Sequence, residues 1–263
     1  MVNAGVDDYK GDEGSSSCIW RNVLIASVVF LGAFGVALVP EAFDRPVTAL
    51  INSFAGRSPL FDSLVAALDY HTFSGVLLMS FVWASWFDTK DPESRARILV
   101  GTLAAFAAGV ISRLMQRTLS THPRPYYDPA LGFHRPLELE VPYNTWNSFP
   151  SDHVAVFIGL VVVLYIARSR FAVFAIGWTI LVEANRTYLG GHYPSDLVGA
   201  AALSVMVVWS AQARWLISAG VKVTKWEQSS PSLFYLGAFF VSYQIATLIV
   251  DIRNVVILLR HAW

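Results

Sequence analysis

The sequence predicts an all-α integral membrane protein: a six-helix transmembrane bundle with a seventh C-terminal helix and an interfacial amphipathic helix. The first observation is composition. Of the 263 residues, 55% are hydrophobic and only 14% are charged, which is about half the charged fraction of a soluble domain. The second is a series of long apolar runs, and the third is a set of polar clusters, rich in arginine and histidine, at the ends of four of these runs.

Seven apolar runs, each of about 17 to 23 residues, are long enough for a helix to cross a hydrocarbon core of about 30 Å. They cover residues 22–39, 71–87, 96–116, 151–167, 171–189, 195–217 and 232–250. Helices are expected because only helices and closed barrels satisfy their backbone in lipid, and barrel strands are shorter. The first six runs form the predicted bundle. The seventh either spans the membrane or leaves the C-terminus on the inner side.

Two further segments complete the chain. Residues 1–20 are rich in Gly, Ser and Asp and are expected to form a mobile tail, which leaves 21–263 as one transmembrane domain. In 52–70 the apolar residues recur at helical spacing, which indicates a helix lying on the membrane surface. The single cysteine, Cys18, excludes an intrachain disulfide, and the zero net charge gives no indication of a nucleic-acid partner.

The distribution of Lys and Arg sets the expected orientation. With the N-terminus in the cytoplasm, ten of the 19 basic residues fall on inner segments and nine on outer segments. Three of the outer residues, Arg117, Arg124 and Arg186, belong to the polar clusters. Without these three, ten basic residues lie on inner segments and about six on outer segments. This modest excess inside follows the positive-inside rule and places the 117–150 loop on the outer face.

Three polar clusters lie where the third to sixth runs end or begin. They are "RTLSTHPRP" with Arg117 and Arg124, "SFPSDH" with Ser151 and His153, and "NRTYLGGHYPSD" with Arg186, His192 and Asp196. Because consecutive spans alternate in direction, all three clusters are expected at one membrane face. Charged groups are costly at such positions, so an intramembrane cluster predicts a functional site.

The residue types in these clusters suit a phosphate group. Arginine carries a fixed charge and a planar fork of donors that matches phosphate oxygens. Pro150 and Pro194 stand where helices are expected to begin, and the helix opening near Pro150 offers free N–H groups to an anion. Ser151 adds a hydroxyl donor there, unless it serves only to cap the helix.

The same clusters also contain groups for nucleophilic chemistry. His192 and Asp196 are four residues apart and share a face if a helix opens near His192. A carboxylate there would hold one imidazole nitrogen protonated and leave the other free to attack. His153 on a facing helix would supply a proton to the leaving oxygen. Gly190-Gly191 suits a tight turn before the nucleophile.

Taken together, the three clusters resemble the signature of the type-2 phosphatidic acid phosphatase superfamily, the lipid phosphate phosphatases and their haloperoxidase relatives. That signature runs Lys, six residues, Arg-Pro; then Pro-Ser-Gly-His; then Ser-Arg, five residues, His, three residues, Asp. This chain has Arg117 through Arg124-Pro125, Pro150-Ser151-Asp152-His153, and Asn185-Arg186 through His192 and Asp196. The order and the internal spacings fit over residues 117–196.

The resemblance implies a role for each residue. His192 would be the nucleophile that forms a phosphohistidine, Asp196 would orient it, and His153 would protonate the leaving group. The phosphoryl group would be held by Arg117, Arg124, Ser151 and Arg186. The scheme requires no cofactor and no metal ion.

Three residues depart from the superfamily pattern. Arg117 replaces lysine, which keeps the charge but changes its reach, and Asn185 replaces serine. Asp152 replaces glycine, and a carboxylate beside a phosphate is unfavourable unless it points away or touches a substrate hydroxyl. Asp152 could also serve only the helix dipole. This departure bears on the identity of the substrate more than on the reaction class.

Two further charged residues lie about one turn inward from this site. Arg113 is one turn before Arg117, and Glu183 is about one turn before Arg186. At similar depth they are expected to form a buried pair that positions the phosphate-binding arginines. The alternative is that each separately touches water or backbone.

By this reading the chain is a membrane phosphatase that acts on a lipid phosphate or diphosphate. The resemblance favours an isoprenoid carrier such as undecaprenyl diphosphate, followed by phosphatidic acid or phosphatidylglycerol phosphate. We expect a bacterial cytoplasmic membrane, with the site facing the periplasm or exterior. Alternatives are a phosphotransferase that passes the phosphoryl group to a second lipid, an anion or lipid transporter, and a non-catalytic lipid-binding homologue. The oligomeric state is left open.

Overall fold

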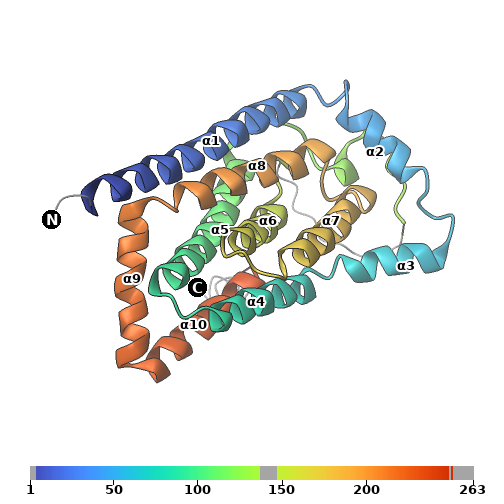
Figure 1. The fold of residues 1–263 in the computed structure, drawn as a ribbon. Coiled ribbons are helices and arrows are strands. Elements are labelled where there is room, and N and C mark those ends of the chain that lie inside the picture. Colours follow the sequence, from blue (N-terminus) through green and yellow to red (C-terminus); the bar gives the residue numbers. More distant parts are fainter. Residues whose placement is uncertain (1–3, 137–146, 249, 251–263) are drawn as a thin grey trace, which may run out of the picture.

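The fold was analysed in a computed structural model that describes residues 4–136, 147–248 and 250 (Figure 1). The described residues form ten α-helices and one short 3-10 helix, Pro125–Tyr127, with no β-strand among them. The helices are α1 (Ala4–Leu38), α2 (Asp44–Asn52), α3 (Pro59–Leu68), α4 (His71–Asp88), α5 (Pro92–Thr118), α6 (Asp152–Ile166), α7 (Ala172–Tyr188), α8 (Pro194–Ser210), α9 (Arg214–Ser229) and α10 (Pro231–Ala246). The predicted all-α membrane fold class is confirmed.

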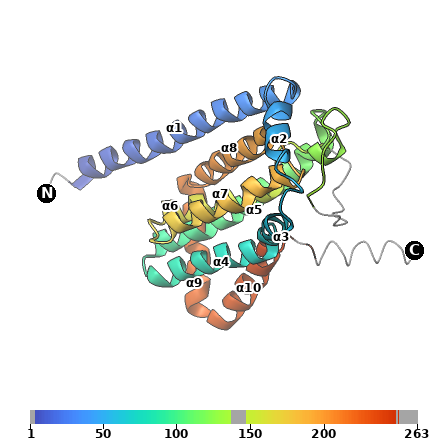
Figure 2. The ribbon, with the colours of Figure 1, turned by 90° about the vertical axis from the view of Figure 1, so that its right-hand side faces the viewer.

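Helix α6 lies at the centre of the bundle, with α5, α7, α8 and α4 packed around it (Figures 1 and 2). Eleven of its 15 residues are buried, as expected of a helix that is apolar on all sides. Small residues allow the close approach of α5. A Cβ added to Gly159 would lie 2.6 Å from the Cβ of Ala105, and one added to Gly109 would lie 2.4 Å from Val156 Cγ2. Such small-residue contacts are typical of helix packing in membranes.

Helix starts follow the proline and cap signals of the sequence. Pro59, Pro92, Pro194 and Pro231 each occupy the first helical turn, where a missing N–H costs nothing. The Asp91 carboxylate accepts a hydrogen bond from Ser94 N at 2.8 Å and caps α5. Pro150 differs from our expectation: it precedes the cap residue Ser151, and α6 begins at Asp152.

The structure departs from the predicted elements in three places. Helix α1 begins at Ala4 and so includes part of the polar stretch that we expected to form a tail, whose mobility stays a prediction. The run 195–217 is broken, because α8 ends at Ser210 and α9 turns away by 73°. The surface segment holds α3, as predicted, but a separate helix, α2, precedes it. Helix α9 lies across one end of the bundle, and α2 and α3 lie at the other end (Figure 1).

Among the described helices, residues 16–38 of α1 and the whole of α5 are long and apolar enough to cross a membrane. Counting the bent pairs α3–α4 and α8–α9 as one span each raises the number to 4. Helices α6, α7, α8 and α10 have 15 to 17 residues, or about 23 to 26 Å, which is shorter than a bilayer core. The chain is an integral membrane protein, and six or seven spans stay a prediction.

Candidate functional site

Four helix ends meet at the end of the bundle that carries α2 and α3 (Figure 1). Helices α5 and α7 finish there, and α6 and α8 begin there. Consecutive antiparallel helices bring the three polar clusters to one level, as predicted. Their central side chains are almost fully buried: the residue exposure is 1% for His192, 4% for Arg124 and 5% for Arg186.

A short loop between α7 and α8 fixes the position of His192. The carbonyl of Arg186 accepts hydrogen bonds from Gly191 N at 2.8 Å and from His192 N at 3.3 Å. Gly190 has φ +79°, a left-handed conformation that favours glycine. From the opposite side, Arg124 Nη1 donates to the Gly191 carbonyl at 2.8 Å. The predicted Gly190-Gly191 turn therefore places the imidazole beside a guanidinium group.

The two nitrogens of His192 have different neighbours. Its Nδ1 lies 3.4 Å from Asp196 Oδ2, and its Nε2 lies 3.1 Å from Arg124 Nη1. Nδ1 is the nitrogen that would carry a proton toward the carboxylate, because Nε2 faces a donor. Two causes lower the pKa of His192 to about 4: burial is the larger, and the charge of Arg124 is the second. The imidazole is therefore neutral near pH 7, with its Nε2 lone pair on the side of Arg124.

His153 is held by its neighbour in the chain. Its Nδ1 lies 3.0 Å from Asp152 Oδ1, which leaves Nε2 for another partner. Its ring also meets the edge of His71 from α4, with ring centroids 4.7 Å apart. Asp152 in turn forms an ion pair with Arg113 Nη2 at 2.5 Å. Asp152 thus bridges Arg113 and His153 instead of pointing toward the helix dipole alone.

The predicted pairing of Arg113 with Glu183 is wrong. Arg113 pairs with Asp152, while Glu183 Oε2 lies 3.2 Å from Arg186 Nε. A second carboxylate, Asp69 Oδ1, lies 3.3 Å from the same Nε. The prediction matched residues by depth, but three-residue spacing on α7 already gives Glu183 a partner on its own helix. Both carboxylates therefore approach the same atom, Nε of Arg186.

The end of α5 presents Gln116, not Arg117, to the buried cluster. Gln116 is fully buried; its Nε2 donates to the Pro150 carbonyl at 2.6 Å, and its Oε1 lies 3.5 Å from Arg124 Nη2. Arg117 is exposed at the rim. Successive helical residues point about 100° apart, so these neighbours face different surroundings. Asn185 is half-buried in the last turn of α7.

Ser151 brings a hydroxyl group without a partner into the site. The residue is fully buried, and its Oγ has no hydrogen-bond partner within the described part of the chain. Its side chain does not cap α6, although its backbone N donates to the Asp196 carbonyl at 3.2 Å. An orphaned buried hydroxyl is costly unless a ligand completes it.

An outer layer of polar residues around Asp196 was not predicted from the sequence. His122 Nε2 lies 3.5 Å from Asp196 Oδ1 and 3.8 Å from Asp44 Oδ2. Asp44 also accepts a hydrogen bond from Ser195 N at 3.0 Å. The one available signal was the position of His122, two residues before Arg124 in the first polar cluster.

Asp128 completes this outer layer from the loop after α5. It accepts hydrogen bonds from Arg45 Nε at 2.8 Å and from the Tyr193 hydroxyl at 2.6 Å. Burial raises the pKa of Asp128, but the two hydrogen bonds outweigh it and hold that pKa below its usual range. The contacts connect α2 to the residue that follows His192, and so stabilise the position of the loop. In the described residues no group of three or more His, Cys, Asp or Glu side chains is arranged to hold a metal ion.

Part of the chain matches the model of a known protein family. The PAP2 superfamily matches residues 102–218, a segment that contains every site residue predicted from the sequence. The predicted resemblance is confirmed. Over 132 residues the chain is 26% identical to the bacitracin transport permease protein BcrC of Bacillus licheniformis, covering 47% of this chain. It spans 60% of the length of that relative.

A solved structure is also similar. It is described as the first transmembrane PAP2 type phosphatidylglycerolphosphate phosphatase, from Bacillus subtilis. The identity is 17% and the TM-score is 0.48, over 72% of this chain and 94% of that chain.

Proposed function

We propose that this membrane protein, whose residues 102–218 match the PAP2 superfamily, is a phosphatase that hydrolyses a lipid phosphate or diphosphate. The observation that carries the proposal is the environment of His192: a neutral imidazole with Nδ1 toward Asp196 and Nε2 beside Arg124. A buried nucleophile next to a guanidinium group suits attack on an anionic phosphorus centre.

In the first step, His192 Nε2 attacks phosphorus, and the bond from phosphorus to the leaving oxygen breaks. His153 Nε2 gives its proton to that oxygen, while Asp152 holds the other side of the ring. The imidazole ring of His192 becomes positively charged, and the Asp196 carboxylate stabilises this charge. Arg124, Arg186 and the Ser151 hydroxyl are the donors proposed for the phosphoryl oxygens.

In the second step, water attacks the phosphohistidine, and His153 takes a proton from it. The P–N bond breaks, inorganic phosphate leaves, and both histidines return to their starting states. A lipid monophosphate would give an alcohol, and a lipid diphosphate would give a lipid monophosphate. No step requires a metal ion or a cofactor from outside the chain.

The substrate and the membrane side are also proposals. The proposed substrate is a polyprenyl carrier diphosphate or a related lipid phosphate. It suits a site at the helix ends, because its tail can stay in the bilayer while its headgroup enters the site. The membrane proposed is a bacterial cytoplasmic membrane, and the distribution of Lys and Arg supports an orientation with the site on the periplasmic or exterior face. Arg117 is exposed near the end of α5, and this exposure supports a role in meeting an incoming headgroup.

The test is phosphate release from purified protein in mixed micelles, with polyprenyl diphosphate, phosphatidic acid and phosphatidylglycerol phosphate as substrates. Wild type should release phosphate from at least one, and His192→Ala should release none while keeping its thermal stability. Release without an added acceptor lipid distinguishes hydrolysis from phosphotransfer. No release from any substrate by folded wild type would reject the proposal.

Transport is the second candidate, because the relative from Bacillus licheniformis is named a transport permease. It makes the opposite prediction for the same variant. A transporter would keep moving its substrate across proteoliposomes after His192→Ala, since binding an anion at the helix ends does not need a nucleophile. Phosphate release that disappears with His192 favours the phosphatase.

A further inference from the structure

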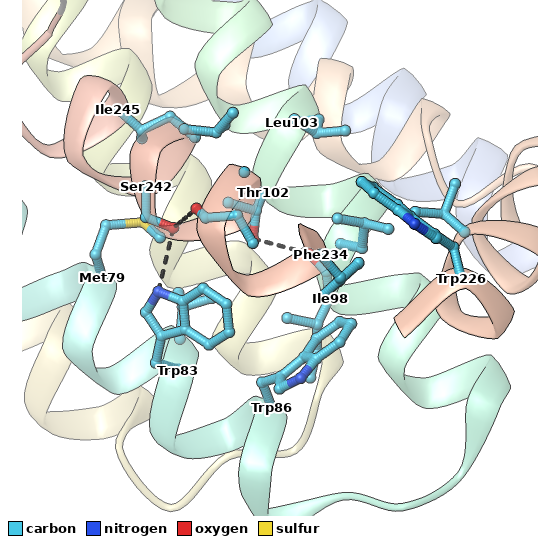
Figure 3. Close-up of a pocket in the computed structure, with 16 residues that line it drawn as sticks. Met79, Trp83, Trp86, Ile98, Thr102, Leu103, Trp226, Phe234, Ser242 and Ile245 are labelled. Atoms are coloured by element: carbon cyan, nitrogen blue, oxygen red, sulfur yellow. Dashed lines mark hydrogen bonds between the residues drawn. The ribbon is translucent and has the colours of Figure 1, made fainter. Parts of the chain in front are cut away.

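A cavity lies between α4, α5, α9 and α10, at the end of the bundle opposite to His192 (Figure 3). Its volume is about 330 Å³, within the size range of ligand pockets. Four aromatic residues contribute to a wall that is otherwise mostly aliphatic: Trp83, Trp86, Trp226 and Phe234. Gly237 leaves part of the wall open, because a Cβ added there would meet no heavy atom within 4 Å.

The hydroxyl groups of this wall and the indole N–H of Trp83 already have hydrogen-bond partners. Trp83 Nε1 donates to Ser242 Oγ at 3.1 Å, and Ser242 Oγ donates to the Ala238 carbonyl at 2.7 Å. The Thr102 hydroxyl donates to the Ile98 carbonyl at 2.8 Å. The lining is therefore mostly apolar, and its hydroxyl groups are already hydrogen-bonded within the protein, which suits hydrocarbon more than a polar ligand.

The depth of the cavity corresponds to one leaflet. Its α5 lining, from Ile98 to Leu103, begins six residues after the start of that helix at Pro92. A rise of 1.5 Å per residue puts this lining about 9 to 17 Å from the helix start, or about half of a bilayer core. The phosphatase site lies at the opposite end of α5, so the cavity belongs to the other leaflet.

Two lysines stand beside the cavity. Val223 and Trp226 of α9 line it, while Lys222 and Lys225 occupy the adjacent face of the same helix and are exposed. In the described part of the chain, neither lysine has an ion-pair partner within 4.0 Å. A nearby carboxylate, Glu227, is already neutralised.

Glu227 is held by two groups from neighbouring helices. Arg95 Nη1 lies 2.7 Å from Glu227 Oε2, and the Tyr235 hydroxyl donates to Oε1 at 2.6 Å. Its charge is therefore balanced within the protein. The lysine pair provides the net positive charge at this edge of the cavity, which complements a phosphate diester.

We propose that this cavity binds one hydrocarbon chain of an anionic phospholipid, whose headgroup phosphate contacts Lys222 and Lys225. The chain lies among the aromatic rings, and the headgroup stays at the interface beside α9. The site is separate from His192 and does not depend on the phosphatase proposal. It assigns α9, which the sequence did not predict, a role in selecting a neighbouring lipid.

The experiment is native mass spectrometry of the purified full chain, titrated with dioleoyl phosphatidylglycerol or with dioleoyl phosphatidylcholine. Gly237→Leu fills the cavity without a backbone clash, and Gly177→Leu is the matched control. Gly177 also has no heavy atom within 4 Å of an added Cβ, but it lies on α7. Thermal unfolding confirms that each variant is folded.

A second pair of variants tests the headgroup. Lys222→Gln with Lys225→Gln removes the two charges, and Lys90→Gln is the control because Lys90 is exposed at the same end of the bundle. Each lysine is expected to account for about fivefold in affinity for an anionic lipid. The double variant should therefore bind phosphatidylglycerol about 25-fold more weakly, while the control should be unchanged.

Wild type is expected to retain one phosphatidylglycerol in clear preference to phosphatidylcholine, and Gly237→Leu is expected to lose it. The adduct should persist in His192→Ala, which places it away from the phosphatase site. Equal binding of both lipids by wild type would overturn the charge recognition. Retention by Gly237→Leu would overturn the placement of the chain in the cavity, and loss in His192→Ala would assign the adduct to the other site.

Discussion

Replacing Asp196 by asparagine tests the central pair of the proposed mechanism. Asn has the size of Asp, so its amide oxygen can keep the hydrogen bond from Tyr193 N, which is 2.8 Å long in wild type. The same oxygen can also accept a hydrogen bond from His192 Nδ1, which lies 3.4 Å from Oδ2 in wild type. The substitution therefore removes the negative charge while the imidazole keeps its tautomer.

The distance in the structure sets the size of the effect. When His192 becomes phosphorylated it gains a positive charge 3.4 Å from Asp196 Oδ2. At an effective dielectric constant of about 20, two unit charges at that separation attract by about 5 kcal/mol. Each 1.36 kcal/mol corresponds to about tenfold in rate. We therefore expect Asp196→Asn to lower kcat/KM by between about 10³-fold and 10⁴-fold.

The assay is phosphate release under single-turnover and steady-state conditions, with the thermal unfolding midpoint measured in parallel. Asp44→Asn is the matched control, because Asp44 is equally buried but contacts Ser195 and His122. This control should lose less than about tenfold, since its charge acts on His192 only through other groups. A folded Asp196→Asn enzyme within tenfold of wild type would refute charge development on His192.

Four further predictions rest on the same geometry. The pKa of His192 is about 4, so protonation of this group should cost little activity between pH 8 and 5, whereas an ordinary histidine would lose about 30-fold at pH 5. Arg124→Gln removes a positive charge that lowers the pKa of His192, so the acid limb of its normalised pH–rate profile should move to higher pH. An unchanged profile would contradict the contact between Arg124 and His192. Gln116→Leu should reduce activity more than tenfold and Arg117→Leu less, measured as kcat/KM, because only Gln116 is buried against Arg124; the reverse order would favour the sequence prediction. Gly190→Ala should lower stability by about 1–2 kcal/mol in thermal unfolding, because its φ is +79° and an added Cβ would lie 2.7 Å from an aromatic carbon; a stability equal to wild type would argue against this loop conformation.

The site also shows how a buried cluster of arginines is balanced before substrate arrives. Arg113 faces Asp152, and Arg186 faces Glu183 and Asp69. An unpaired charge at such depth would be strongly destabilising. The carboxylates therefore balance these guanidinium charges within the protein.

Local signals in the sequence determined the class of the fold and the composition of the site. Long apolar runs can satisfy their backbone in lipid only as helices, and prolines mark where four of the helices begin. The order and spacing of the three polar clusters were enough to predict that they meet, because antiparallel helices return to the same level. None of this required knowledge of how the helices pack.

Only the tertiary structure decided which side chains touch. A rotation of about 100° per residue put Gln116 in the cluster and Arg117 at the rim, and the sequence pattern does not distinguish these two neighbours. Asp44 and Asp69 come from segments far from the clusters in the sequence, so their contacts with Ser195 and Arg186 depend on how α2 and α3 cover the bundle end. Ion pairs are set by distances of a few ångströms between side chains, and those distances are fixed by helix rotation and packing, which no local pattern specifies.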